Sequence, residues 1–153
     1  MRCITVSAAH GLFLAGRSMI PTHNSDGLLG VAHRQVGHPN YACLILRRTL
    51  KELSQPNGLI DRALKLTQGI AHYNAQDYLL TYPTGAKIQF GYCESNQDMY
   101  RYQGSGYAVI CFDELTRFHE HQYTTICGFQ RSIYPGLKKW IRAATNPGNV
   151  GHA

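Results

Sequence analysis

The chain has 153 residues, of which 44% are hydrophobic and 16% are charged, and this composition is typical of one globular domain rather than a disordered chain. No apolar run reaches the roughly 20 residues of a membrane span, and the first residues lack the order of a signal peptide, so we expect a cytoplasmic protein without membrane association. The formal net charge of +6 favours polyanionic partners such as nucleic acid.

Short strands followed by a helix are predicted for the first 37 residues. Apolar stretches at residues 4–6, 11–16 and 19–24 are broken by glycines and predict short strands. The composition changes after Asn24. Ser25 then opens a predicted helix that extends to about Gly37, because apolar residues recur at helical spacing.

Strands and helices alternate over the rest of the chain. Continuous apolar runs predict strands that are buried on both faces of a parallel sheet. The predicted strands are 41–46, 107–112 and 140–144, the predicted helices are 59–70 and 120–133, and a predicted hairpin joins 78–82 to 86–92. This alternation predicts an α/β fold with a mostly parallel sheet between layers of helices.

Neither the cysteines nor the histidines form a metal-ligand pattern. The five cysteines are spread out without a C-x-x-C pair, and the eight histidines lack the spacing of zinc ligands. We expect reduced thiols, most of them buried.

Two adjacent carboxylates, Asp113 and Glu114, follow the apolar run that ends at Phe112. Ligands of open parallel sheets bind beyond the carboxyl ends of the strands. An aspartate there can hold the Mg²⁺ that bridges the phosphates of ATP, and the next carboxylate can orient and deprotonate the attacking water. Carboxylates at strand ends also cap helices in unrelated folds, so the pair alone leaves both interpretations open.

The phosphate-binding loop that normally accompanies such a pair does not occur in the sequence. Its pattern is G-x-x-x-x-G-K-[ST], and only Ser25, at the start of a predicted helix, stands where the last residue of that loop would be.

Residues 25–153 resemble the ATPase domain of phage terminase large subunits. The resemblance lies in the order and spacing of six segments: SDGLL at 25–29, LILRRT at 44–49, GAKIQFGY at 85–92, YQGSGY at 102–107, VICFDELT at 109–116 and ATNPG at 144–148. It implies a three-layer P-loop NTPase core of the ASCE type, incomplete at its N-terminus. It also implies an ATP-hydrolysing motor that translocates double-stranded DNA into procapsids.

The resemblance implies specific roles for five residues. Asp113 is similar to the Walker B aspartate that binds Mg²⁺, and Glu114 to the catalytic glutamate. Ser25 is implied as a ligand of the nucleotide and of Mg²⁺. Thr145 and Asn146 resemble the coupling motif that senses the γ-phosphate.

Three arginines are further candidates by the same resemblance. Arg47 and Arg48 are implied to contact phosphate or DNA, and Arg131 to serve a neighbouring subunit. A solvated charge at the end of a strand or helix is the alternative for each.

The implied partners are double-stranded DNA, a portal protein and a small terminase subunit, in a ring oligomer in the cytoplasm of an infected bacterial host. The nuclease domain of the family falls outside this chain, so no nuclease site is expected.

Residues 2–25 resemble the C-terminal splicing blocks of an intein. The residues that carry the resemblance are Cys3, His10, Thr22, His23, Asn24 and Ser25. Asn24 can cyclise onto its own carbonyl and cleave the chain after itself, with His23 as proton donor, and Ser25 is the hydroxyl nucleophile. His10 would aid proton transfer. Cys3 and Thr22 resemble a variant class in which that cysteine accepts the acyl group.

Splicing at this point would rebuild the missing loop, because an upstream segment ending in Gly-Lys would be joined to Ser25. We therefore expect an intein segment at 1–24 and a truncated terminase ATPase domain at 25–153.

Three alternatives stay open: a helicase-like or other P-loop ATPase, a trans-splicing intein half with a terminase extein, and a basic nucleic-acid binding module without catalysis. Because the loop lysine is missing, we expect this chain by itself to bind ATP weakly or not at all and to be inactive in hydrolysis.

Overall fold

The computed structural model describes residues 13–15, 20–22 and 24–145. Its elements are, in chain order, β1 (Phe13–Ala15), β2 (Ile20–Thr22), α1 (Asn24–His33), β3 (Ala42–Arg47), α2 (Leu50–Leu53), α3 (Leu59–Leu66), β4 (His72–Asn74), β5 (Leu79–Thr81), β6 (Lys87–Tyr92), the 3₁₀ helix η1 (Asn96–Tyr102), β7 (Val109–Asp113), the 3₁₀ helix η2 (Leu115–Arg117), α4 (Glu120–Cys127) and β8 (Trp140–Ala144). The α/β fold predicted from the sequence is confirmed.

The main sheet has six strands in the order β4-β5-β6-β3-β7-β8. The central strand β3 runs parallel to β6 and β7, and β8 runs parallel to β7. The pairs β4–β5 and β5–β6 are antiparallel, so the sheet is mixed and mostly parallel. The predicted hairpin is confirmed as β5 and β6. Its turn is closed by a hydrogen bond from the amide of Tyr82 to the carbonyl of Ala86 over 2.9 Å.

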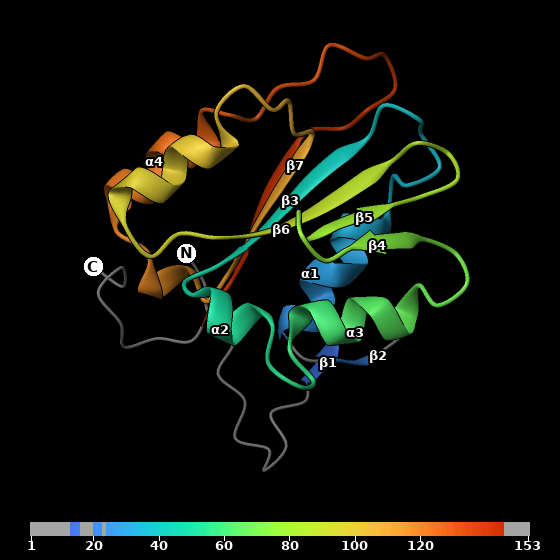
Figure 1. Ribbon diagram of the computed structural model, residues 1–153, viewed down its shortest axis with the longest axis horizontal. Coiled ribbons are helices and arrows are strands. Elements are labelled where there is room, and N and C mark those ends of the chain that lie inside the picture. The colour runs from blue at the N-terminus through green and yellow to red at the C-terminus, as the bar shows by residue number, and fades with distance from the viewer. Residues whose placement is uncertain (1–12, 16–19, 23, 146–153) are drawn as a thin grey trace.

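Helices cover both faces of this sheet, with α1 and α3 on one side and α4 on the other (Figure 1). Successive side chains of a strand point to opposite faces. Cys43 and Ile45 of β3 therefore pack into the core under α1 and α3, whereas Leu44 and Leu46 pack into the core under η1 and α4. The continuous apolar run of β3 follows from its burial on both faces.

Three predicted helices end earlier in the structure than the sequence pattern indicated. Helix α3 ends at Leu66 rather than Ile70. Helix α1 ends at His33 rather than near Gly37, and the hydroxyl of Tyr41 donates a hydrogen bond to the carbonyl of Ala32 over 2.7 Å at this end. Helix α4 ends at Cys127 rather than Ile133. The chain after α4 instead bonds to the segment just before β7, where the amide of Arg131 donates to the carbonyl of Tyr107 over 2.9 Å.

The short elements α2, β4, η1 and η2 had not been predicted, because none spans enough residues for a hydrophobic period to develop. At the N-terminus, β1 and β2 form a separate antiparallel pair, in which Phe13 lies opposite Thr22. In the part of the chain that the structure describes, no helix is long and apolar enough to cross a membrane.

A close approach between β6 and η1 requires a glycine. A Cβ atom added to Gly91 would lie 2.5 Å from the hydroxyl oxygen of Tyr102 and 2.8 Å from two of its ring carbons. Tyr102 is buried, and its hydroxyl donates to the carbonyl of Tyr92 over 2.6 Å and accepts from the amide of Tyr92 over 2.8 Å. The tyrosine ring thus lies directly over Gly91 and ties η1 to the end of β6.

We expect Gly91→Ala to destabilise the fold by about 1–3 kcal/mol, because the added methyl group overpacks the site against Tyr102. Gly30→Ala is the matched control, since a Cβ at Gly30 in α1 meets nothing within 4 Å and alanine favours a helix by about 0.5–1 kcal/mol. Urea denaturation of both variants measures the difference. Equal stability of the two variants would contradict the close contact.

Candidate functional site

The carboxyl ends of three neighbouring parallel strands place the candidate site at one edge of the sheet. Leu46 of β3 lies opposite Phe112 of β7, so Arg47 and Asp113 follow at the same level. On the other side of β7, Asp113 lies opposite Ala144 of β8, and Thr145 follows directly. The parallel pairing therefore brings residues that are far apart in the sequence to one edge.

Ser25 in the first turn of α1 reaches Asp113 directly. Its hydroxyl donates a hydrogen bond to Oδ1 of Asp113 over 2.9 Å. Helix α1 packs against β7 and β8, and its first turn is also held by a salt bridge of 2.9 Å between Asp26 and Arg62 of α3. The start of α1 and the end of β7 are thus held together.

The Asp113 carboxylate is almost completely buried, with 1% of the residue exposed. Burial raises the pKa of Asp113 above its ordinary value, although the charge of Arg47 and the hydrogen bond from Ser25 act in the opposite direction. Oδ2 of Asp113 accepts no hydrogen bond from the residues described, and the Nε atom of Arg47 is 3.6 Å away. This carboxylate oxygen is therefore buried without a hydrogen-bond donor among the described residues.

Glu114 turns the chain sharply after β7. Its backbone has φ 56° and ψ 52°, which is the left-handed region and costs a residue with a side chain about 1–2 kcal/mol. Its two carboxylate oxygens accept from different arginines, Oε1 from Arg47 over 3.0 Å and Oε2 from Arg117 over 2.9 Å. Burial alone raises the pKa of Glu114, but the hydrogen bonds and charges of Arg117 and Arg47 hold it below its usual value.

Arg47 connects the two acids of the pair. Its guanidinium group faces Asp113 and Glu114, and its Nε atom also lies 4.0 Å from the Glu52 carboxylate. The side chain is 18% exposed, and within the described ranges Nε donates no hydrogen bond. The guanidinium group of Arg47 is thus surrounded by the carboxylates of Asp113, Glu114 and Glu52.

Thr145 joins the end of β8 to the turn after Glu114. The amide of Thr116 donates to Oγ1 of Thr145 over 3.2 Å, and the Thr145 hydroxyl donates to Oγ1 of Thr116 over 2.9 Å. Asn146, the other predicted residue of the coupling motif, lies outside the described residues.

Arg48 and Arg131 do not lie in this cluster. Arg48 donates hydrogen bonds to the carbonyl of Cys93 and, over 2.8 Å, to Oε1 of Gln122 in α4. Arg131 is exposed, and it lies near Tyr107 at the opposite end of β7 from Asp113. The contacts with phosphate, DNA or a neighbouring subunit expected for these two residues stay predictions.

Sequence reasoning missed two residues of the cluster, Glu52 and Arg117. The Arg117 guanidinium bonds to both Glu52 and Glu114. A helix-capping pattern was available for Glu52, because Thr49 lies three residues before it and accepts a hydrogen bond from its amide over 3.2 Å. Arg117 follows Glu114 by three residues, a spacing that brings side chains together in helical turns.

The predicted splicing residues are only partly described. Thr22 ends β2, and Asn24 and Ser25 are the first two residues of α1. Cys3, His10 and His23 lie outside the described residues. The splicing geometry therefore remains a prediction.

The residues at the site fit a magnesium ion that is shared with phosphate. In the described part of the chain, no group of three or more His, Cys, Asp or Glu side chains could hold a metal ion by itself. Mg²⁺ is commonly bound by one or two carboxylates together with substrate phosphates and water. The Oδ2 atom of Asp113, which accepts no hydrogen bond from the described residues, and the Ser25 hydroxyl are oxygen ligands of the required kind.

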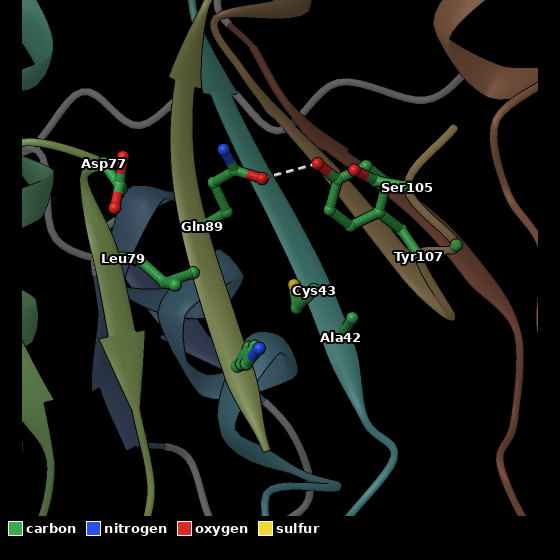
Figure 2. A pocket seen from close by; sticks show the side chains of 9 residues that line it. Ala42, Cys43, Asp77, Leu79, Gln89, Ser105 and Tyr107 are labelled. Atoms are coloured by element: carbon green, nitrogen blue, oxygen red, sulfur yellow. Dashed lines mark hydrogen bonds between the residues drawn. The ribbon is translucent and has the colours of Figure 1, made fainter. Parts of the chain in front are cut away.

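A pocket of about 440 Å³ lies elsewhere on the sheet (Figure 2). It is lined by residues at the amino ends of β3 and β6, including Ala42 and Lys87, and the hydroxyl of Tyr107 donates to Gln89 across it over 2.5 Å. It is formed at the opposite ends of these strands from Arg47 and Asp113, so it is no part of the carboxylate cluster.

The fold is similar to the solved structure of the large terminase from a thermophilic bacteriophage, with a TM-score of 0.60 and 14% sequence identity. The match covers 81% of this chain and 30% of that chain, so this chain spans less than a third of that terminase. No protein-family model and no curated protein matches the sequence. At 14% identity the likeness shows the fold alone, and it bears out the expected resemblance to a terminase at that level.

We expect Asp113→Asn to raise the stability of the chain at neutral pH without Mg²⁺. The raised pKa means that folding favours the protonated carboxyl, so the stability that Asp113 contributes is present below its unfolded pKa and is lost as the pH rises through the folded pKa. Asparagine stays neutral and can still accept the hydrogen bond from Ser25. The advantage of the variant should therefore grow from roughly pH 4 to pH 7 in urea denaturation.

Asp61→Asn is the control with the opposite sign. A hydrogen bond from Lys65 lowers the pKa of Asp61, which is also paired with Lys65 at 2.9 Å on the surface of α3. The small stabilisation of the fold by ionised Asp61 is present at neutral pH. It is lost as the pH falls through the pKa of Asp61 in the folded state. A loss of stability in Asp113→Asn at pH 7 would contradict the buried charge as the dominant effect.

Proposed function

We propose that residues 25–153 are part of the ATP-hydrolysing motor of a phage terminase large subunit, which moves double-stranded DNA into procapsids. The observation that carries the proposal is the 2.9 Å hydrogen bond from Ser25 to Asp113, with Glu114 beside it. The start of a helix and the acidic end of a buried parallel strand are the two parts from which an ATPase site of this type is built. The likeness in fold to a large terminase supports the proposal.

In this proposal Asp113 and Ser25 hold Mg²⁺ together with the phosphates of ATP. The metal ion, when bound, neutralises charge on the phosphate oxygens. The oxygen of Asp113 that has no hydrogen-bond donor among the described residues, and the Ser25 hydroxyl next to it, support this assignment. Burial keeps water away from the carboxylate and strengthens its attraction for a cation.

Glu114 is proposed to orient the attacking water and to accept its proton. Both carboxylate oxygens of Glu114 accept hydrogen bonds from arginines. One oxygen therefore has to lose its arginine before it can accept a proton. Arg47 is the arginine that lies between Glu114 and Asp113, and its Nε donor is not used within the described residues. A phosphate group beside Asp113 would compete for Arg47, which agrees with the phosphate contact expected for this residue.

Thr145 and Asn146 are proposed to relay hydrolysis to DNA movement. The two hydrogen bonds between Thr145 and Thr116 support this role, because Thr116 lies only two residues after Glu114. A displacement of Glu114 would thereby be passed to the end of β8. Contacts of Arg48 with phosphate or DNA and of Arg131 with a neighbouring subunit remain part of the proposal.

The proposed partners are those of a packaging motor: double-stranded DNA, a portal protein and a small terminase subunit, with the complete protein in a ring. The net charge of +6 agrees with a polyanionic partner. The proposed location is the cytoplasm of an infected bacterial host.

Residues 1–24 are proposed to be the C-terminal segment of an intein, with Ser25 as the first residue of the spliced product. The position of Ser25 at the start of α1 supports this division, because a preceding Gly-Lys would complete a phosphate-binding loop there. Ser25 would act first as the splicing nucleophile and later as a ligand of Mg²⁺.

In the spliced protein we expect Glu114→Gln to lower kcat by about 100-fold or more, with the affinity for ATP unchanged within a few-fold. Glutamine keeps the shape of the side chain but cannot accept the proton of water. Steady-state ATPase assays and equilibrium nucleotide titration give the two values, and Glu120→Gln, at an exposed position at the start of α4, is the control. A parallel loss of hydrolysis and binding would count against the role of Glu114.

For the splicing segment, we expect cleavage after Asn24 when the upstream part of the intein is supplied, with a product that begins at Ser25. Asn24→Ala should abolish this product, because alanine has no side-chain amide to cyclise, whereas Asn40→Ala, at an exposed turn position, should leave it unchanged. Mass spectrometry of the products decides between these outcomes. Efficient cleavage in Asn24→Ala would exclude the proposed chemistry.

A further inference from the structure

Arg117 lies between two carboxylates that come from different parts of the chain. Its Nη1 atom donates to Oε2 of Glu114 over 2.9 Å and is also hydrogen-bonded to Oε1 of Glu52 in α2. The Arg117 side chain is 34% exposed and the Glu52 side chain 21% exposed, so this contact is partly shielded from water. One guanidinium group therefore connects α2, the end of β7 and η2.

The two oxygens of Glu114 differ in their surroundings. Oε1 bonds to Arg47, which also faces the buried Asp113. Oε2 bonds to Arg117, whose second partner is Glu52 rather than any residue of the Ser25–Asp113 pair. Oε1 thus bonds on the side on which Asp113 lies, and Oε2 is anchored to α2, although the carboxylate of Glu52 also lies 4.0 Å from Nε of Arg47.

We propose that Glu52 and Arg117 are positioning residues that hold the Glu114 carboxylate by Oε2, so that Oε1 faces the Asp113 side with a fixed orientation. This inference rests on the proposed ATPase function and names residues that the motif at 109–116 does not identify. A charge-assisted hydrogen bond fixes both the distance and the direction of a carboxylate.

Glu52 is required because a lone arginine at the surface would be mobile. Glu52 lies in the first turn of α2, where its amide is capped by Thr49, so its own backbone is held in place. It balances the charge of Arg117 and limits the rotamers that the long side chain can adopt. The Glu52–Arg117 pair thereby fixes the side chain of Glu114 to α2. The backbone of Glu114 itself forms a sharp left-handed turn.

The test compares Arg117→Met, Arg117→Lys and Glu52→Gln in the complete spliced ATPase, with Mg²⁺ and ATP. We expect Arg117→Met to lower kcat by about 10- to 100-fold, because a small misplacement of a catalytic group can cost that much. KM and the equilibrium affinity for ATP should change by less than about three-fold, since Arg117 does not face the Asp113 side. Arg117→Lys should recover most of kcat, and Glu52→Gln should cause a smaller loss of the same kind.

Two further measurements separate positioning from general stability. If Glu52 acts through Arg117, the double variant Glu52→Gln/Arg117→Met should lose no more kcat than Arg117→Met alone. In nitrogen-15 NMR without nucleotide, the Arg117 guanidinium protons should exchange slowly in the unsubstituted protein and fast in Glu52→Gln/Glu114→Gln. Arg101→Met is the matched control, because Arg101 forms an equivalent salt bridge three residues from Asp98 in η1, and it should leave kcat unchanged.

The outcomes distinguish this inference from the proposed function. A kcat of Arg117→Met within two-fold of the unsubstituted value, or an increase in kcat, would overturn the positioning role while the ATPase assignment stands. An unsubstituted spliced protein that does not hydrolyse ATP would remove the ATPase assignment and this inference with it. If Arg117→Met does not fold, the rescue by Arg117→Lys and the loss in Glu52→Gln still decide the matter, and failure of both overturns the proposal.

Discussion

The buried carboxylate of Asp113 determines how the surrounding residues are arranged. A charge that is removed from water needs partners close by, and here they come from the start of α1 through Ser25 and from the end of β3 through Arg47. The parallel pairing of β3 and β7 brings Arg47 to the same level as Asp113. Glu114, which shares Arg47 with Asp113, is thereby included in the same group of charges.

This arrangement has a cost to stability. The raised pKa of Asp113 indicates that burial outweighs the help of Arg47 and Ser25, and Glu114 has a left-handed backbone. Strain and unfavourable charge at one edge of a sheet are typical of sites that bind a ligand, because the ligand relieves them. Two well-packed cores on the faces of the sheet supply the stability that such an edge requires.

Much of the fold could be predicted from the sequence, because β3 and β7 are continuous apolar runs and β7 leads directly into Asp113 and Glu114. The contact of Ser25 with Asp113 agrees with the resemblance to the terminase ATPase domain, which implied both residues as ligands of Mg²⁺. The contact of Glu52 with Arg117 could not be predicted, since it joins two very short helical segments that are far apart in the sequence. The end of α4 was also missed, because the pairing of residues 130–131 with the segment just before β7 is a long-range contact that overrides the local helical pattern.

Neighbouring arginines at the end of β3 tie the strand to opposite sides of the molecule. Arg47 turns toward the acids, whereas Arg48 turns toward Cys93 and Gln122, and Gln122 is almost fully buried in α4. Deleting a single residue in β3 would move Arg48 to the position of Arg47, and inserting one would move Arg47 to the position of Arg48, so either change would leave one of the two contacts without its arginine. Length variation during evolution should consequently be confined to loops such as the one before β3, with the strand itself constant in length.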